Sequence, residues 1–418
     1  MALMAGALCE AQVVDPEPGR LTGDGPYIFY LPASPANGLK GAQAAGAAEM
    51  QTVGTAEMQA AGSTAGAARE SAGAIAGTAS AGGSAASGEG QARVVTVDES
   101  GAIIDTTGAV PRAFRVVSHD GQISFDVQLH PLRPQAWELP KTAKTFVASD
   151  PHGRLDCLVS ILKAGGVIDD ALKWTFGPNR LVLCGDVMDR GDDVTQIYWL
   201  LYELENEAAA AGGSVSFIYG NHEPMVLAGD LRYARQKYQA LADTLGTAVP
   251  LMYGRDTEIG RWLAGCNTIL LVGDDLFVHG GLSRDLLALD MDIPEVNALC
   301  SEGLFMSSKE RYAHSPAMKV LFKYTGPVWY RGFFFSKKKY GGKMPREDLD
   351  ALLERYGARR VFVGHTINRN VKTIYGGRVV AVDVDAKINH DAGRSRAVLI
   401  DGEKLFAVYD SGALKPLN

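Results

Sequence analysis

The sequence of 418 residues predicts an α/β domain preceded by a small β module. Beyond residue 141, short apolar runs alternate with amphipathic stretches, which is typical of strands alternating with helices. Before it, strand-like runs are separated by turn residues. Between two of these runs the composition changes to Ala, Gly, Ser and Thr, and such a tract has little apolar surface to bury.

The first residues, 1–15, read as the possible remnant of an export signal. The start "MALMAGALCEAQ" is apolar from Ala2 to Leu8 and small residues follow, but no basic segment precedes them. An unstructured amino terminus explains the same residues equally well. The protein is therefore expected to be periplasmic or exported if this segment is a truncated signal, and cytoplasmic otherwise.

The β module is expected within 16–140, with its core from Pro26 to His130. Strands are predicted at "PYIFYL", "ARVVTVD", "AFRVVSHDG" and "QISFDVQLH", with Asp-Gly and Ser-Gly turns between some of them. The Ala/Gly/Ser insertion, about 39–92, interrupts the module and is expected to be disordered. Nothing in this module suggests chemistry.

The α/β domain is expected to span 141–412. Its expected strands are Thr145–Ser149, Arg180–Cys184, Val215–Tyr219, Thr268–Val272, Leu276–His279, Arg360–Gly364, Val379–Val384, Ala397–Ile400 and Leu405–Val408. Its expected helices are Leu155–Ala164, Val194–Ala211, Leu231–Leu245 and Arg346–Tyr356. An irregular stretch at about 283–344, rich in aromatic residues and lysines, is expected to form a cap.

Composition excludes several classes of protein. The net charge of −7 argues against a protein that coats nucleic acid or an anionic membrane. The five cysteines form no CxxC pair, so a zinc knuckle is not indicated. Outside the Ala/Gly-rich region no apolar run is long enough for a transmembrane helix.

Polar clusters follow five of the predicted strands. The stretch "LVLCGDVMDRGDD" crowds four aspartates and an arginine behind a buried strand, which is costly unless something neutralises them. The five clusters contain Asp150 and His152; Asp186, Asp189 and Arg190; Asn221, His222 and Glu223; His279; and His365. Because ligands bind at the carboxyl ends of strands in open α/β sheets, these side chains are expected to converge.

The donors are carboxylates, imidazoles and an amide, without thiolate, a set that suits Mn, Fe or Zn in an open site. They divide between two divalent metal ions. Asp150 and His152 hold one, Asn221, His279 and His365 hold the other, and Asp186 bridges both. Each cluster alone could be a turn, a helix cap or a surface ion pair. Their joint occurrence at strand ends favours a metal centre with room for a bridging hydroxide.

The motifs "GDVMDRG", "GNHE" and "HGGL" resemble those of calcineurin-like metallophosphoesterases of the phosphoprotein-phosphatase type. The tracts "DLRYARQKY" and "GPVWYRGFF" resemble bacterial members related to Shewanella-like phosphatases. The resemblance covers about 145–408 and implies a four-layer αββα sandwich. One position departs from the family pattern: Ser149 stands where the family has glycine, and a slightly altered turn is expected rather than a lost ligand.

The resemblance also implies roles around the metals. Arg190 matches a family arginine that clamps phosphate, while Arg331 is matched by context only and could instead stack on Trp329 or Tyr330. His222 resembles the general acid, and Asp189 would orient it and raise its pKa. Asn221 is expected to contact substrate as well as metal, and Glu223 to support the site from behind.

The leading hypothesis is a phosphoric-monoester hydrolase, a protein phosphatase that uses a hydroxide activated by two metals. Its partners would be phosphorylated proteins or small phosphoesters, not nucleic acid. One alternative keeps the centre but assigns a nucleotide or diadenosine polyphosphate substrate. Another is a catalytically silent surface or interaction protein, which the intact ligand set disfavours.

Overall fold

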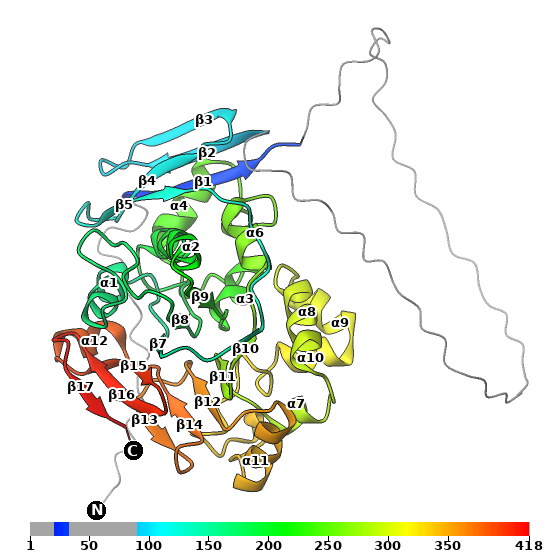
Figure 1. Ribbon diagram of the computed structural model, residues 1–418. Coiled ribbons are helices and arrows are strands. Elements are labelled where there is room, and N and C mark those ends of the chain that lie inside the picture. Colours follow the sequence, from blue (N-terminus) through cyan, green and yellow to red (C-terminus); the bar gives the residue numbers. More distant parts are fainter. Residues whose placement is uncertain (1–20, 33–89, 418) are drawn as a thin grey trace, which may run out of the picture. The chain divides into compact units, whose positions relative to one another are not determined.

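Two six-stranded β-sheets form the centre of the structure (Figure 1). The computed structural model describes residues 21–32 and 90–417. The first sheet has the order β17-β16-β15-β7-β8-β9, and the second has the order β13-β14-β12-β11-β10-β6. The expected α/β fold is thus confirmed.

The strands have these bounds. The first sheet contains β7 (Lys144–Ala148), β8 (Arg180–Leu183), β9 (Ser214–Phe217), β15 (Ser395–Asp401), β16 (Lys404–Tyr409) and β17 (Leu414–Pro416). The second contains β6 (Glu138–Leu139), β10 (Ile269–Val272), β11 (Asp275–Val278), β12 (Arg360–Val363), β13 (Lys372–Ile374) and β14 (Val379–Ala381).

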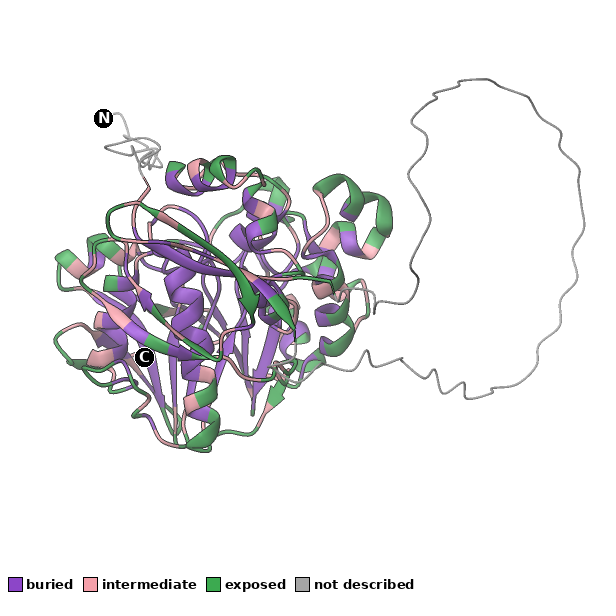
Figure 2. Cartoon of the chain, turned by 90° about the horizontal axis from the view of Figure 1, so that it is seen from above, coloured by how far each residue is buried: buried purple, intermediate pink, exposed green. Residues whose placement is uncertain are grey.

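The two sheets share one apolar layer. Val147 and Val182 of the first sheet and Phe277 and Phe362 of the second belong to the same buried cluster. The alternate residues of β7 and β8, such as Phe146 and Leu181, pack instead in the cluster that includes the helices. Because side chains alternate along a strand, each sheet buries both faces, as a four-layer αββα sandwich requires. Figure 2 shows this burial along the strands.

Helices cover the outer faces of the sheets (Figure 1). They are α1 (Leu155–Ala164), α2 (Val194–Ala210), α3 (His222–Leu227), α4 (Gln236–Thr244), α5 (Val249–Met252), α6 (Glu258–Ala264), α7 (Arg284–Leu287), α8 (Ile293–Gly303), α9 (Ser308–His314), α10 (Pro316–Leu321), the short 3-10 helix η1 (Lys338–Tyr340), α11 (Arg346–Arg355) and α12 (Ala386–Asp391). Helix α2 is buried almost all round and includes the fully buried Tyr198 and Trp199.

Parallel pairing aligns the carboxyl ends of the strands that precede the polar clusters. In the first sheet β7, β8 and β9 are parallel, so Ala148, Leu183 and Phe217 stand in one row. In the second sheet β11, β12 and β14 are parallel, with Val278, Val363 and Ala381 in register. The loops that leave these strands therefore emerge at common sheet edges.

The amino-terminal strands form two small antiparallel sheets. One contains β1 (Asp24–Tyr30), β2 (Gln91–Val97) and β3 (Ile103–Ala109), and the other contains β4 (Ala113–Val117) and β5 (Ser124–Gln128). Strand β3 was not predicted, and β2 begins within the range expected for the insertion. Tyr30 pairs with Ala92 across β1 and β2, on either side of the insertion.

These strands pack on α2 through specific polar contacts. The backbone N–H of His119 donates to Asp193 at 2.7 Å, and the ring Nδ1 lies 2.8 Å from the other oxygen of that carboxylate. The side chain of Gln196 donates to the carbonyls of Gly23 and Val117. The indole of Trp199 donates to the Pro26 carbonyl. Asp193 directly precedes α2 and follows the predicted site loop.

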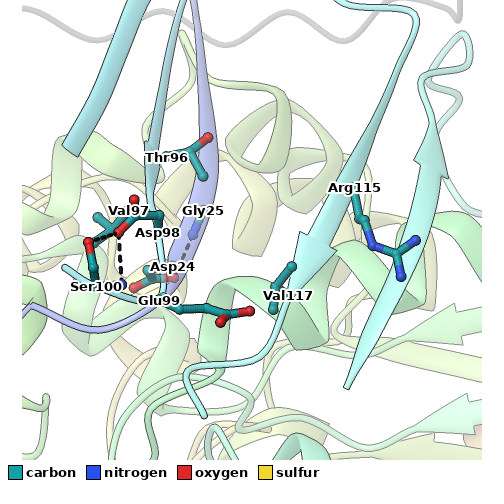
Figure 3. A pocket seen from close by; sticks show the side chains of 10 residues that line it. Asp24, Gly25, Thr96, Val97, Asp98, Glu99, Ser100, Arg115 and Val117 are labelled. Carbon is teal, nitrogen blue, oxygen red and sulfur yellow. Dashed lines mark hydrogen bonds between the residues drawn. The ribbon is translucent and has the colours of Figure 1, made fainter. Parts of the chain in front are cut away.

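A pocket of about 440 Å³ lies among β1, β2 and β4 (Figure 3). Asp24, Asp98, Glu99 and Arg115 are among its lining residues. Asp98 already accepts hydrogen bonds from the backbone and hydroxyl of Ser100, and Asp24 accepts one from the Gly25 backbone. Asp24 and Asp98 thus stabilise turns of the module through these hydrogen bonds.

Two predictions about the α/β domain are wrong. Residues 231–235 are not helical, and α4 begins only at Gln236. In this segment the Tyr233 carbonyl accepts the backbone N–H of Arg190 at 2.8 Å. The stretch 283–344, expected to be irregular, contains four helices and η1.

Some predictions lie outside the residues that the structure describes. They concern the export-signal remnant and nearly all of the low-complexity insertion. Within the described ranges, no helix has the length and apolar character needed to cross a membrane.

Candidate metal centre

The loops that leave the aligned strands adopt a strained backbone. Six predicted site residues without the freedom of glycine have positive φ angles: Asp150, His152, Asp186, Asp189, Arg190 and His365, between 45° and 75°. This left-handed conformation is uncommon for such residues and clusters at functional sites. The strain turns each side chain back toward the edge where the strands end.

Three imidazoles point at one carboxylate oxygen. The Oδ2 atom of Asp186 lies 3.1 Å from the Nε2 of His279 and 3.8 Å from the Nε2 atoms of His152 and His222. The ligand atoms of His152, Asp186 and His222 lie within 4.8 Å of one another, as do those of Asp186, His279 and His365. Asp186 belongs to both groups, as expected of a bridging ligand.

Backbone carbonyls fix the orientation of two of these rings. The Nδ1 of His152 lies 2.9 Å from the Met188 carbonyl, and the Nδ1 of His279 lies 2.7 Å from the Cys184 carbonyl. Because a carbonyl can only accept, Nδ1 carries a proton in both rings, and Nε2 is the ring atom that faces the Asp186 carboxylate.

Asn221 is the residue before α3, yet its side chain does not cap the helix. Its Oδ1 instead lies 3.2 Å from the Nε2 of His279, and its amide nitrogen donates to the sulfur of Met225. The helix-cap alternative is therefore wrong, and the amide oxygen stays available to the site.

His365 completes this side of the centre. Its ring lies 5.0 Å from the ring of His279 and meets Trp329 edge-on at 5.7 Å. The Nε2 atom is buried and has no hydrogen-bond partner within the described residues. Burial and then the charge of Arg331 lower the pKa of His365 well below its ordinary value. A neutral imidazole with an unpaired, buried nitrogen is suited to binding a metal ion.

Asp150 lies beside this group without joining either ligand cluster. The backbone N–H of His365 lies 3.2 Å from both of its carboxylate oxygens. The hydroxyl of Ser149, where the resembling family has glycine, is within hydrogen-bonding distance of the same carboxylate and 3.0 Å from the Cys184 carbonyl. The departure therefore adds a donor behind Asp150.

Two glycines leave room for the centre. A Cβ atom on Gly220 would lie 2.1 Å from the Oδ1 of Asp186 and 2.8 Å from the Cε1 of His279. A Cβ atom on Gly185 would lie 2.5 Å from the Nδ1 of His279. Side chains at these positions would displace the carboxylate and imidazole of the predicted ligands.

Glu223 holds the Asp186 loop from behind. Its fully buried carboxylate accepts backbone N–H groups of Asp186, Val187, Met188 and Gly220 at 2.6–3.3 Å. It also accepts the hydroxyl of Tyr198 from α2. These bonds fix the loop that carries Asp186 and Asp189.

His222 and Asp189 form a buried pair at the rim of the centre. The Nδ1 of His222 is hydrogen-bonded to the Oδ2 of Asp189, while the His222 backbone N–H donates to the Oδ1 of Asp186 at 3.0 Å. Burial lowers the pKa of His222, but the charge of Asp186 and the bond to Asp189 outweigh it. The pKa therefore lies above its ordinary value, which favours an imidazolium that can donate a proton.

Two arginines approach the centre from different elements. The guanidinium of Arg190 lies over the Tyr233 ring at 5.6 Å, and its charge acts on His152 and His222. The charge of Arg331 acts on His365 and Asp383. Tyr233 and Trp329 thus flank the centre, each beside one of its histidines.

Asp383 is a residue that the sequence analysis did not identify. Its side chain is 1% exposed, and its pKa is raised well above the ordinary value by burial and then by the charge of Asp150. Sequence reasoning placed it inside a strand ending at Val384, whereas β14 ends at Ala381. Asp383 follows that buried strand as the other site residues follow theirs, and this is the signal that could have found it.

The donor set fits divalent cations. Buried carboxylates and imidazoles converge here, and Asp186 belongs to both groups of ligand atoms. Fold and site together define a metal-dependent hydrolase of the αββα type. The chain also matches the family model of calcineurin-like phosphoesterases over residues 143–369, more than half of its length. It belongs to that family, whose members use a dinuclear divalent metal centre and hydrolyse phosphoester bonds.

Two relatives of this chain are named as protein phosphatases. Shewanella-like protein phosphatase 2 of Arabidopsis thaliana is 27% identical over 288 residues, which cover 58% of this chain and 71% of the relative. Shewanella-like protein phosphatase 1 of Plasmodium berghei is 27% identical over 228 residues, covering 53% and 61% of the two chains.

A crystal structure of a cold-active protein-tyrosine phosphatase from a psychrophilic Shewanella species superposes with a TM-score of 0.71. It is 30% identical, and the match covers 79% of this chain and 96% of that one. The resemblance drawn from the motifs is thus confirmed, and the alternatives of a dinucleotide polyphosphate hydrolase or a silent surface protein are not favoured.

Proposed function

We propose that this protein is a metal-dependent phosphatase that removes phosphate from serine, threonine or tyrosine side chains of phosphorylated proteins. Relatives named as protein phosphatases, one of them a tyrosine phosphatase, support this substrate class. The observation that carries the proposal is the convergence of three imidazoles on the Oδ2 atom of Asp186, beside the His222–Asp189 pair.

Six residues are proposed to hold two divalent cations: Asp150, His152, Asp186, Asn221, His279 and His365. Asp150 and His152 would serve one cation, and Asn221, His279 and His365 the other, with Asp186 between them. When bound, the cations supply Lewis acidity that lowers the pKa of water and stabilises charge on phosphate oxygens. The oxygen and nitrogen donors suit Mn, Fe or Zn.

The remaining residues act on substrate. The guanidinium groups of Arg190 and Arg331 are proposed to bind the phosphate oxygens through charge-assisted hydrogen bonds. The Asn221 amide is proposed to contact substrate as well as metal. His222, held by Asp189, would donate its Nε2 proton to the leaving oxygen of the alcohol side chain. Asp189 keeps that ring protonated on Nδ1 and correctly turned.

Region 283–344 is proposed to act as a cap. Its Trp329 meets the ring of His365, and the carbonyl of Pro327 accepts the backbone N–H groups of Gly280 and Gly281 at 2.7 and 3.0 Å. These contacts hold an aromatic wall beside the metal centre. A peptide substrate would lie against this wall and Tyr233.

The test is a metal analysis and a substrate panel. Protein purified without chelator is analysed for bound Mn, Fe and Zn, and turnover is measured on peptides carrying phosphoserine, phosphothreonine or phosphotyrosine and on diadenosine tetraphosphate. We expect phosphopeptide turnover that disappears on chelation and in Asp186→Asn. Turnover of the dinucleotide without turnover of phosphopeptides would overturn the substrate class, and metal-independent turnover would overturn the mechanism.

A further inference from the structure

Asp383 is a buried residue, and one of its carboxylate oxygens has no hydrogen-bond partner among the described residues. Its side chain is 1% exposed, and its Oδ2 atom makes no hydrogen bond to any described residue. A buried ionised carboxylate is costly unless it is paired or neutralised by a metal ion. A functional role for Asp383 would explain why this position holds an aspartate despite the cost of burying it.

Strand register places Asp383 beside the metal centre. In the parallel pair of β12 and β14, Val363 aligns with Ala381, and the backbone N–H of Val382 donates to the Val363 carbonyl at 2.8 Å. Two residues beyond that aligned pair stand His365 and Asp383. The Asp383 carbonyl accepts the backbone N–H of Asn368 at 3.0 Å, which holds the segment at the same sheet edge.

The charges around Asp383 need a cation. Burial and then the charge of Asp150 raise the pKa of Asp383, while the charges of His279 and Arg331 lower it. The buried carboxylates of Asp150, which follows β7, and Asp383, which follows β14, cannot both ionise readily unless positive charge lies between or beside them.

Other buried aspartates of the chain show what a structural role looks like. Asp24 lies 3.3 Å from the ammonium of Lys237 and accepts hydrogen bonds from Gly25 and Tyr27. Asp275 receives two hydrogen bonds from the guanidinium of Arg360. Asp383 has no comparable partner among the described residues, so a purely structural role leaves its charge unexplained.

We propose that Asp383 is a further carboxylate of the metal centre, one that strengthens the binding of divalent cations by adding negative charge beside His365 and Asp150. Like Asp150, it lies outside the two groups whose ligand atoms are within 4.8 Å of one another. The role proposed for Asp383 is to contribute its charge. This inference rests on the proposed metal centre. It adds a residue that none of the sequence motifs contains.

The experiment measures metal binding, not turnover. Isothermal titration with Mn²⁺ and thermal melting with and without Mn²⁺ are carried out on the chelator-stripped full chain, on Asp383→Asn and on Asp383→Ser. Asp24→Asn is the matched control, because it removes another buried aspartate that belongs to the β module. Asp186→Asn tests the centre itself.

We expect both Asp383 variants to bind Mn²⁺ about 10- to 100-fold more weakly, as removal of groups around metal ligands does. Without metal, Asp383→Asn should melt no lower than the parent, because the amide removes the repulsion between the carboxyl groups of Asp383 and Asp150. Asp24→Asn should melt at a lower temperature and keep the parent affinity for Mn²⁺.

Other results separate the two proposals. If Asp186→Asn abolishes Mn²⁺ binding while both Asp383 variants bind within about twofold of the parent, the role of Asp383 is refuted and the metal centre stands. If Asp186→Asn also binds normally, the metal centre itself is refuted. A metal-free Asp383→Asn protein that melts at a lower temperature than the parent would identify a structural role for Asp383. If the Asn variant does not fold, the affinity for Mn²⁺ is measured on Asp383→Ser.

Discussion

The Nδ1 of His222 is hydrogen-bonded to the Oδ2 of Asp189, and both side chains are almost completely buried. The other oxygen of Asp189 has no hydrogen-bond partner within the described residues. The carboxylate is therefore dedicated to the imidazole. This bond fixes the orientation of the imidazole that we propose as the proton donor.

Replacing Asp189 by Asn should lower kcat about 100-fold or more, because the amide neither raises the pKa of His222 nor favours the same ring tautomer. The loss should be larger for phosphoserine peptides than for para-nitrophenyl phosphate, whose leaving oxygen needs little protonation. Steady-state kinetics on both substrates, with metal content measured in parallel, checks this. Equal losses on the two substrates would contradict a role in proton donation.

Replacing Arg190 or Arg331 by Ala should weaken inhibition by inorganic phosphate about 10- to 100-fold, because hydrogen bonds to charged groups contribute roughly 1.5–3 kcal/mol. Lys at either position should restore only part of the affinity, since it lacks the forked donors of arginine. Arg255→Ala is the matched control, because Arg255 contacts Ser301 and lies over Phe305. An Arg331→Ala protein with unchanged phosphate inhibition would leave Arg331 with a stacking role only.

Gly220→Ala should lower both metal occupancy and activity, because its Cβ would overlap the Oδ1 of Asp186. Overpacking of this kind costs about 1–3 kcal/mol and displaces the side chain that cannot be accommodated. Metal content by elemental analysis and melting temperature are the measurements. Gly108→Ala, where a Cβ meets nothing within 4 Å, should behave like the parent. A fully metallated Gly220→Ala protein would show that the carboxylate does not need this space.

The contact between His119 and Asp193 predicts a pH dependence of stability. The hydrogen bond to Asp193 raises the pKa of His119 above its ordinary value of 6.5, against the effect of burial. Nearby Asp192 adds to the rise and Lys237 opposes it. A raised pKa in the folded state means that the stabilisation is complete below about pH 6.5 and is lost as pH rises through the folded value.

The measurement is the melting temperature of the metal-free protein between pH 5.5 and 8.5. The parent should lose stability across the upper part of this range relative to His119→Gln, which lacks the titrating group. His314→Gln is the control, because His314 pairs with Glu302 at an exposed site. Parallel pH profiles of the parent and His119→Gln would show that this contact carries no charge.

Nine strands of the two central sheets were predictable because each contains a short, buried apolar run. Strands β6, β13 and β17 were not predicted, since they are two or three residues long and none of their residues is buried. Helix α1 was predicted to its final residue, since its apolar positions repeat with helical spacing. The start of α4 was not, because Tyr233 uses its carbonyl for Arg190 rather than for a helix. Such a tertiary hydrogen bond leaves no mark in a single sequence.

Parallel pairing brings distant strand ends to common edges. It gathers His152, Asp186, His222, His279 and His365 within the two groups of ligand atoms. Asp383 escaped prediction because "VVAVDVDA" continues the apolar alternation past the true end of β14. The strand ends at Ala381 and the chain turns away, which depends on its neighbours in the sheet. Strand β3 was missed for a related reason: its side chains are mostly exposed, so its sequence lacks a buried face.

Tyr30 and Ala92 are cross-strand neighbours, so the end of β1 and the start of β2 lie side by side. The closure entropy of such a connection grows only with the logarithm of its length. Sixty residues can therefore be inserted, shortened or exchanged between β1 and β2 with little thermodynamic consequence for the sheets below. The connection between β1 and β2 is therefore an insertion site at which a change of sequence leaves the metal centre undisturbed.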